Sequence, residues 1–210
     1  MKIGTDGVAV GALATVGASG SRVLDAGAGC GLISLMLAQR FPHAIIDAVE
    51  LDEGAFTDMK ENIAHSPWCN RIKPILGDYA AVEGKYDLIV SNPPYYIYGE
   101  KSADERRASA RHAGGLSPMS LTEFAATHLT EHGLLAMILP AECAAEIIGY
   151  AAFKRLSLRR RIDISTSPRR GITRTYLEFS RNTAAVPQIS KLAIGSDEFK
   201  ELTKDFYLNY

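Results

Sequence analysis

Two prolines and two tyrosines follow an apolar run in the sequence Ser-Asn-Pro-Pro-Tyr-Tyr, residues 91–96. Proline lacks a backbone donor and pushes the preceding residue out of the helical region, so a strand must end here. The side-chain oxygen of Asn92 and the carbonyl of Pro93 can accept hydrogen bonds, and the ring of Tyr95 can stack on a planar group. Pro93 and Pro94 restrict the backbone that carries these acceptors. Besides ending a strand, the segment is therefore a candidate catalytic site.

A second candidate ligand site is the glycine-rich sequence Leu-Asp-Ala-Gly-Ala-Gly-Cys-Gly-Leu, residues 24–32, between a predicted strand and a predicted helix. Glycines allow a sharp turn and a close backbone approach to a ligand, and a helix N-terminus offers free N–H groups. The spacing differs from the dinucleotide fingerprint Gly-x-Gly-x-x-Gly, and the Gly-Lys-Ser/Thr ending of a P-loop is missing. The loop therefore favours another nucleotide-like cofactor. Its glycines are Gly27, Gly29 and Gly31.

With Asp25 two positions before the first glycine, the pattern resembles the first motif of class I S-adenosylmethionine-dependent methyltransferases. The resemblance implies that the loop lies against the methionine part of the cofactor. It also implies that Glu50, followed by Leu51, binds the ribose and that Asp78 lies near the adenine. The Asn-Pro-Pro-Tyr sequence likewise resembles the fourth motif of amino-methyltransferases, which act on planar nitrogens. That resemblance places Asn92 beside the methyl group.

The elements that must position these residues alternate between strands and helices. Apolar runs predict strands at 22–27, 44–51, 71–78, 86–91 and 133–140, and helical patterns predict helices at 32–40, 53–65, 121–131 and 141–153. Two β-rich pieces, at 156–165 and 174–180, flank a Pro-Arg-Arg-Gly turn and indicate an antiparallel hairpin. We therefore expect an α/β, Rossmann-like class I methyltransferase fold. Its sheet is expected to be mostly parallel and seven-stranded, with an antiparallel C-terminal hairpin and helices on both faces.

Composition favours one soluble domain. The 210 residues are 47% hydrophobic and 22% charged, without a long apolar run or a signal-peptide pattern, so we expect a cytoplasmic protein that contacts no membrane. Three cysteines without Cys-x-x-Cys spacing predict no metal site. We expect a single methyltransferase domain over 1–210. Its cofactor half would span about 1–96, and its RNA-contacting elements about 97–118 and 154–181.

The net charge of −1 conceals a basic C-terminal part, because residues 154–181 hold nine Lys and Arg residues against two acidic ones. Such a segment, together with arginines in the polar stretch 97–118, predicts contact with phosphates, although solvated surface charge is the alternative. Neutralising the Arg159–Arg161 run is expected to weaken RNA binding. The candidate substrate-binding residues are Tyr95, Arg107, Arg111, Arg159, Arg160, Arg161, Arg169 and Arg170.

The whole chain resembles the bacterial tRNA (adenine-N6)-methyltransferases that modify adenosine 37 of valine tRNA. The resemblance rests on segments in unchanged order: 1–12, 24–40, 46–52, 61–68, 86–96, 107–111 and 206–208. It implies S-adenosylmethionine as cofactor, the valine tRNA anticodon loop as partner, and Thr5 and Asp6 near the cofactor. Members of that family typically carry a further segment before the Met-Lys-x-Gly-Thr-Asp run at which this sequence starts.

Two other functions are compatible with the sequence. The Asn-Pro-Pro-Tyr tetrad also occurs in enzymes that methylate a glutamine side chain of release factors, which usually carry a separate N-terminal helical domain. A catalytically idle RNA-binding protein on the same fold is the second alternative, and the intact Glu50 and Asp78 argue against it. The sequence indicates no protein partner, no oligomeric state and no role for Tyr96.

Overall fold

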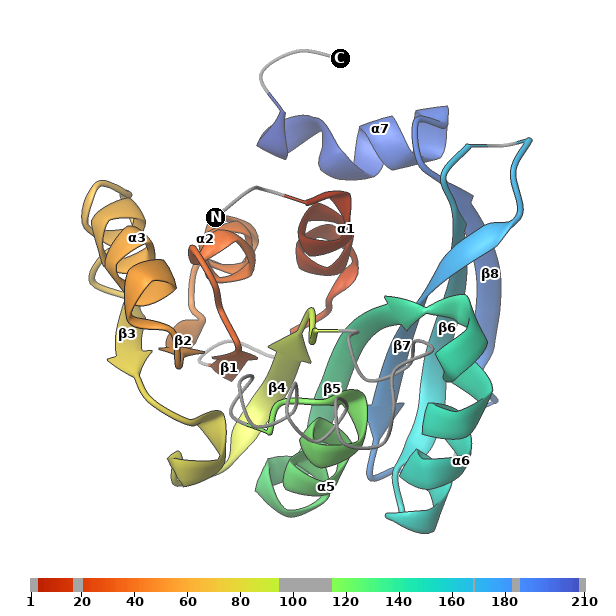
Figure 1. Ribbon diagram of the computed structural model, residues 1–210, viewed down its shortest axis with the longest axis horizontal. Helices are drawn as coiled ribbons and strands as arrows, with labels where there is room; N and C mark the ends of the chain where they lie inside the picture. Colours follow the sequence, from red (N-terminus) through yellow and green to blue (C-terminus); the bar gives the residue numbers. More distant parts are fainter. Residues whose placement is uncertain (1–3, 17–20, 95–114, 168, 183–185, 208–210) are drawn as a thin grey trace.

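The computed structural model describes residues 4–16, 21–94, 115–167, 169–182 and 186–207, in which eight strands form one sheet (Figure 1). The strand order is β3-β2-β1-β4-β5-β7-β6-β8. Strands β3 to β5 run parallel, β7 is antiparallel to β5 and β6, and β8 is parallel to β6. The α/β class and the hairpin are confirmed, with one strand more than the seven expected. The strands are β1 (Arg22–Ala26), β2 (Ile45–Glu50), β3 (Ile72–Leu76), β4 (Tyr86–Ser91), β5 (Leu129–Pro140), β6 (Ser157–Ser165), β7 (Ile172–Ser180) and β8 (Gln188–Ala193).

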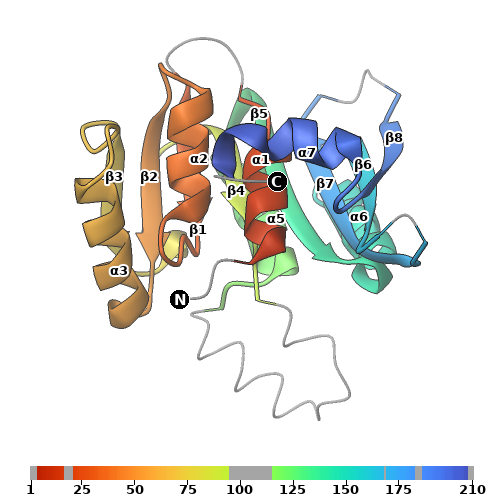
Figure 2. The same cartoon turned by 90° about the horizontal axis from the view of Figure 1, so that it is seen from above.

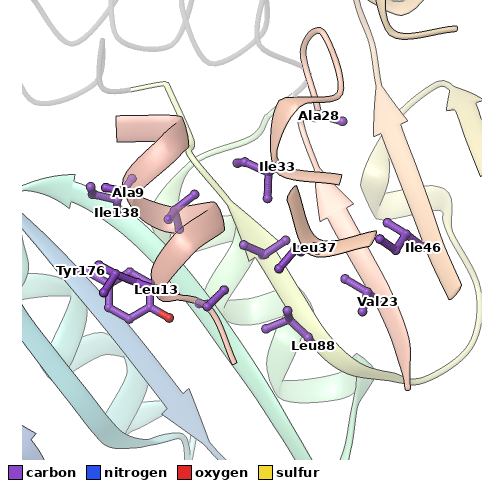
Figure 3. Packing of buried hydrophobic residues seen from close by; sticks show 14 of the residues in the cluster. Ala9, Leu13, Val23, Ala28, Ile33, Leu37, Ile46, Leu88, Ile138 and Tyr176 are labelled. Atoms are coloured by element: carbon purple, nitrogen blue, oxygen red, sulfur yellow. The ribbon is translucent and has the colours of Figure 1, made fainter. Parts of the chain in front are cut away.

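Helices cover both faces of the sheet (Figures 1 and 2). On one face lie α1 (Thr5–Leu13), α2 (Leu32–Arg40), α3 (Glu53–Ala64) and α7 (Asp197–Thr203), and on the other α5 (Pro118–His128) and α6 (Ala144–Phe153). Successive residues of the central strands alternate between two cores. Val23 and Leu88 pack beneath α1 and α2 (Figure 3), whereas Leu24 and Ile89 pack beneath α5 and α6. Because both faces are buried, these strands appear in the sequence as nearly continuous apolar runs.

Helix α1 was not predicted from the sequence, because it has no polar face to create a periodic pattern. Residues 7–13 are all buried. A Cβ added at Gly7 would lie 3.1 Å from Leu32 Cδ2, and one at Gly11 would lie 2.7 Å from Met36 Sδ. Because Leu32 and Met36 belong to α2, helices α1 and α2 approach each other closely and run in the same direction. As a result, the first turn of α1 lies beside the loop that precedes α2.

Basic side chains hold the C-terminal end of α1. Arg40, the last residue of α2, donates to the carbonyls of Gly11 and Ala14, both at 2.7 Å. Arg160 of β6 donates to the carbonyl of Leu13. Carbonyls in the last turn of a helix lack partners within the helix, and cations there also interact favourably with the helix dipole. The sequence predicted Arg160 as an RNA-binding residue, and the structure shows that its side chain also holds the end of α1.

Other boundaries differ from those expected. Helix α5 begins at Pro118, because Ser117 and Ser120 form a capping box at its start, and β5 then begins at Leu129 instead of 133. Short 3₁₀ turns occur at η1 (Tyr79–Ala81), η2 (Ala141–Cys143) and η3 (Lys204–Phe206). Within the described part of the chain, no helix combines the length and apolar character needed to cross a membrane.

Candidate active site

The predicted cofactor residues gather at one edge of the sheet because their strands are parallel. Strand β1 lies between β2 and β4, and all three run in the same direction. The glycine loop follows the carboxyl end of β1, Glu50 is the last residue of β2, and Asn92 directly follows β4. Asp78 follows β3, which is parallel to β2. This edge is where open α/β sheets bind ligands.

The glycine loop is tied to the end of β2. The amides of Gly27 and Ala28 both donate to the carbonyl of Val49 at 2.9 Å. The amide of Gly29 donates to Glu50 Oε2 at 2.7 Å. Gly27, Gly29 and Gly31 have φ values of 72°, 57° and 84°, a region that favours glycine. Strand β2 therefore fixes the backbone of the loop that follows β1.

Asp25 lies beneath this loop with no exposed surface. Its Oδ2 accepts hydrogen bonds from the amide of Ser34 at 3.0 Å and from the Ser34 hydroxyl at 2.7 Å, while Oδ1 has no partner among the described residues. Burial raises the pKa of Asp25 to about 7, an effect that the hydrogen bonds from Ser34 partly oppose. The structure therefore shows Asp25 holding the start of α2, and its contact with the cofactor, which the motif implies, stays a prediction.

Glu50 is the last residue of β2 and is half-buried. Its Oε1 accepts from the amides of Leu51 and Asp52, both at 2.9 Å. Among the described residues, Oε2 accepts only the bond from the glycine loop, so this oxygen can accept another. The neighbouring Leu51 side chain offers an exposed apolar surface. Together these residues present an acceptor and an apolar surface beside the loop.

Asp78 lies one strand further along the same edge and is half-buried. Its Oδ1 accepts from the amide of Ala80 at 2.9 Å and thereby caps η1. The amide of Gly77 donates to the carbonyl of Glu50 at 2.9 Å, which joins the ends of β2 and β3. Asp78 and Glu50 are thus carboxylates at successive strand ends, as the sequence predicted.

The Asn-Pro-Pro segment follows β4 directly. Ser91, the last residue of β4, donates its buried hydroxyl to the carbonyl of Ala26 at 2.7 Å. Pro93 is buried, and Asn92 and Pro94 are half-buried. The start of the predicted catalytic segment is therefore fixed against the end of β1, next to the glycine loop.

Thr5 and Asp6 lie at the same edge, in the first turn of α1. Thr5 is exposed, and Asp6 Oδ2 accepts from Arg174 Nε at 2.8 Å. Arg174 pairs in register with Pro140, the last residue of β5. The sequence included Arg174 only as part of the basic segment, and no motif identified its partner.

The basic residues of the hairpin occupy two different ends of the sheet. Arg169 and Arg170 are exposed between β6 and β7, at the edge that carries the glycine loop. Arg159 lies near the start of β6, roughly 20 Å from the end of that strand at about 3.3 Å per residue. Of these three arginines, Arg169 and Arg170 in the turn therefore lie at the edge of the candidate site.

Two arginines of the hairpin make ion pairs within the protein. Arg160 Nε lies 3.3 Å from Glu178 Oε2, and Glu178 is buried. Arg161 Nε donates to Asp163 Oδ1 at 2.9 Å. Part of the charge counted as a phosphate-binding patch is therefore compensated internally.

Tyr95, Arg107 and Arg111 lie outside the described residues, so their roles stay predictions. After that gap, Leu116 is buried, and a Cβ added at Gly27 would lie 2.5 Å from Leu116 Cδ2. The chain that returns from the predicted substrate segment thus packs on the glycine loop. No sequence pattern indicated this contact, because Leu116 is an isolated leucine before a helix cap.

Burial of Asp25 predicts a specific pH dependence of stability. The folded state keeps a proton on Asp25 up to about pH 7, whereas an unfolded aspartate loses it near pH 3.8. The free energy of unfolding should therefore fall between about pH 4 and 7, with this group contributing at most about 1.4 kcal/mol per pH unit. Urea unfolding at several pH values should show a shallower fall in Asp25→Asn, which keeps an acceptor for Ser34.

The matched variant Ser34→Ala removes a hydrogen bond that lowers the pKa of Asp25, so the fall should extend to higher pH. An identical slope in the parent protein and Asp25→Asn would contradict this account of the buried carboxyl group.

Comparisons with known proteins agree with this arrangement. A sequence profile of the methyltransferase small domain family matches residues 9–157. A tRNA1(Val) (adenine(37)-N6)-methyltransferase of Parabacteroides distasonis is 42% identical over 99% of this chain and 91% of its own length. A protein of Erwinia tasmaniensis with the same name is 41% identical over 99% of this chain and 89% of its own.

Solved structures share the fold at low sequence identity. A predicted O-methyltransferase of Agrobacterium tumefaciens superposes with a TM-score of 0.73 and 17% identity, covering 95% of this chain and 96% of its own. A putative RNA methyltransferase of Pyrococcus horikoshii gives a TM-score of 0.58 and 21% identity, covering 80% and 76%. The chain belongs to the methyltransferase small domain family and, within it, to the family of bacterial tRNA1(Val) (adenine(37)-N6)-methyltransferases.

Proposed function

We propose that this chain transfers a methyl group from S-adenosylmethionine to the exocyclic N6 of adenine in tRNA, with adenosine 37 of valine tRNA as the target. The observation that carries the proposal is the placement of the Asn-Pro-Pro segment beside the glycine loop. It is supported by relatives named tRNA1(Val) (adenine(37)-N6)-methyltransferase, which match 99% of this chain. The residues of the site support methyl transfer to an amine, and the names of the relatives support adenosine 37 of valine tRNA as the substrate.

The residues at the strand ends fit the cofactor by their chemistry. A loop of glycines leaves room for a ligand beside the backbone, Glu50 Oε2 retains acceptor capacity for a hydroxyl group, and Asp78 is a second acceptor one strand away. The exposed side chain of Leu51 can cover an apolar face of the ligand. When bound, S-adenosylmethionine supplies an electrophilic methyl group.

Asn92 and Pro93 act on the amine that receives this group. The lone pair of an exocyclic amine is delocalised into its ring, which makes the nitrogen a poor nucleophile. Two acceptors on its N–H groups, the Asn92 side-chain oxygen and the Pro93 carbonyl, favour a pyramidal nitrogen with an exposed lone pair. Because Ser91 and the prolines fix this segment in advance, little reorganisation is needed in the transition state. Tyr95 would stack on the base.

The proposed tRNA-binding surface centres on the turn between β6 and β7. Arg169 and Arg170 are exposed there, on the same edge as the glycine loop, and a target base flipped into the site would bring its flanking phosphates to this edge. Arg107 and Arg111 lie outside the described residues and remain candidate phosphate contacts on the basis of the sequence. Arg160 and Arg161 contribute less, because their charges are paired inside the protein.

Replacing Asn92 tests the proposed acceptor. Asn92→Ala is expected to lower kcat by about 10²- to 10³-fold, while the Kd for S-adenosylmethionine, measured by calorimetry, rises by no more than about threefold. Asn92→Asp keeps an oxygen acceptor and should retain more activity than the alanine variant. Full activity of Asn92→Ala would refute the mechanism.

Replacing Arg169 and Arg170 together by alanine tests the RNA surface. Each lost phosphate contact is expected to reduce the slope of log K against log salt by about 0.7 to 0.9, so tRNA binding should weaken most at low salt. Arg159→Ala, at the opposite end of β6, is the matched control and should have a smaller effect. An unchanged slope in the double variant would exclude the turn from the RNA surface.

The substrate class is tested with S-adenosylmethionine carrying a labelled methyl group. The chain is incubated with total tRNA in one reaction and with a release factor in another. Label is expected in tRNA. Label in the release factor alone would establish glutamine methylation instead, and tRNA binding without cofactor binding would identify an idle RNA-binding protein.

A further inference from the structure

The two ends of α1 are held by contacts of different kinds. At its C-terminal end, Arg40 and Arg160 donate to backbone carbonyls. At its N-terminal end, no side chain caps the helix, because the N-cap residue is Gly4. The carboxylate of Asp6, in the first turn, instead extends to β7 and pairs with Arg174 at 2.8 Å. An ion pair between distant parts of the sequence thus anchors this end.

The anchored turn lies where the cofactor residues are. Gly7 packs against Leu32, the first residue of α2, so the turn is adjacent to the end of the glycine loop. Arg174 lies opposite Pro140, the last residue of β5, and therefore at the same edge of the sheet. Figure 2 shows α1 beside α2, with α7 lying across it. The ion pair therefore connects the first turn of α1 with β7 at the edge of the sheet that carries the candidate cofactor site.

We propose that Arg174 is a positioning residue for methyl transfer, which acts through Asp6 to hold the first turn of α1 in place for cofactor binding. This inference rests on the proposed function. It adds to the glycine loop and the strand-end carboxylates a contact from the antiparallel part of the sheet. The same hairpin carries Arg169 and Arg170, so α1 and the proposed RNA-binding turn share one support.

If the Asp6–Arg174 pair served only to stabilise the fold, its loss would lower the global free energy of unfolding. The side chains of Asp6 and Arg174 are 23% and 33% exposed, and ion pairs of this exposure contribute little to global stability. Helix α1 stays packed through residues such as Ala9 and Leu13, which belong to the main core. Loss of the pair should therefore change the position of the first turn while the helix and the fold remain intact.

The test measures S-adenosylmethionine binding by isothermal titration calorimetry in the full chain. Arg174→Gln and Asp6→Asn are each expected to raise the Kd by about fivefold. The rise in Kd of the double variant should be smaller than the product of the two single rises, because both substitutions remove the same ion pair. Arg174→Lys retains a cation for Asp6 and should stay within about twofold of the parent protein.

The matched control is Arg22→Gln, which breaks an Arg–Asp pair of similar length at the opposite edge of the sheet. Arg22 lies 2.9 Å from Asp47, which is more buried than Asp6, so this variant should lose more stability yet bind the cofactor normally. An unchanged Kd in Arg174→Gln, or an equal rise in Arg22→Gln, would overturn the inference alone. Failure of the parent protein to bind S-adenosylmethionine would overturn the proposed function and the inference with it.

Discussion

The hydrogen bonds between Asp25 and Ser34 are the contact on which the site depends. They hold the start of α2 to the end of β1, and the glycine loop has to turn between these two points. With the loop held in this way, the amide of Gly29 donates a hydrogen bond to Glu50, which connects the ends of β1 and β2 into one unit. The raised pKa of Asp25 shows the electrostatic cost of burying this carboxyl group. The burial of Asp25 therefore opposes stability, while its hydrogen bonds fix the two ends of the glycine loop.

The rest of the sheet adds to this unit from two sides. In the parallel half, β4 delivers Asn92 beside the loop through the contact between Ser91 and β1. In the antiparallel half, the β6–β7 hairpin delivers the proposed RNA-binding turn and Arg174 to the same edge. Because β5 is parallel to β4 and antiparallel to β7, both halves meet at the candidate site.

The sequence predicted those features that depend on local patterns. Apolar runs located β1, β2 and β4 closely, and glycine spacing with strand-end carboxylates located the candidate cofactor site. Helix α1 was missed because it is buried on nearly all sides, and β8 because its residues are mostly exposed and form no apolar run. Arg160 pairs with Glu178 across the hairpin and Arg174 pairs with Asp6 near the other end of the chain, whereas composition indicated only their charge. Tertiary contacts, which no local pattern encodes, determine these features.

The most direct measurement is mass spectrometry of nucleosides and nuclease fragments from an unmodified valine tRNA transcript, after treatment with this chain and S-adenosylmethionine. The account predicts N6-methyladenosine at position 37, and none in a transcript whose adenosine 37 is replaced by guanosine. Absence of methylated adenosine, or a methyl group on another nucleoside, would contradict the account.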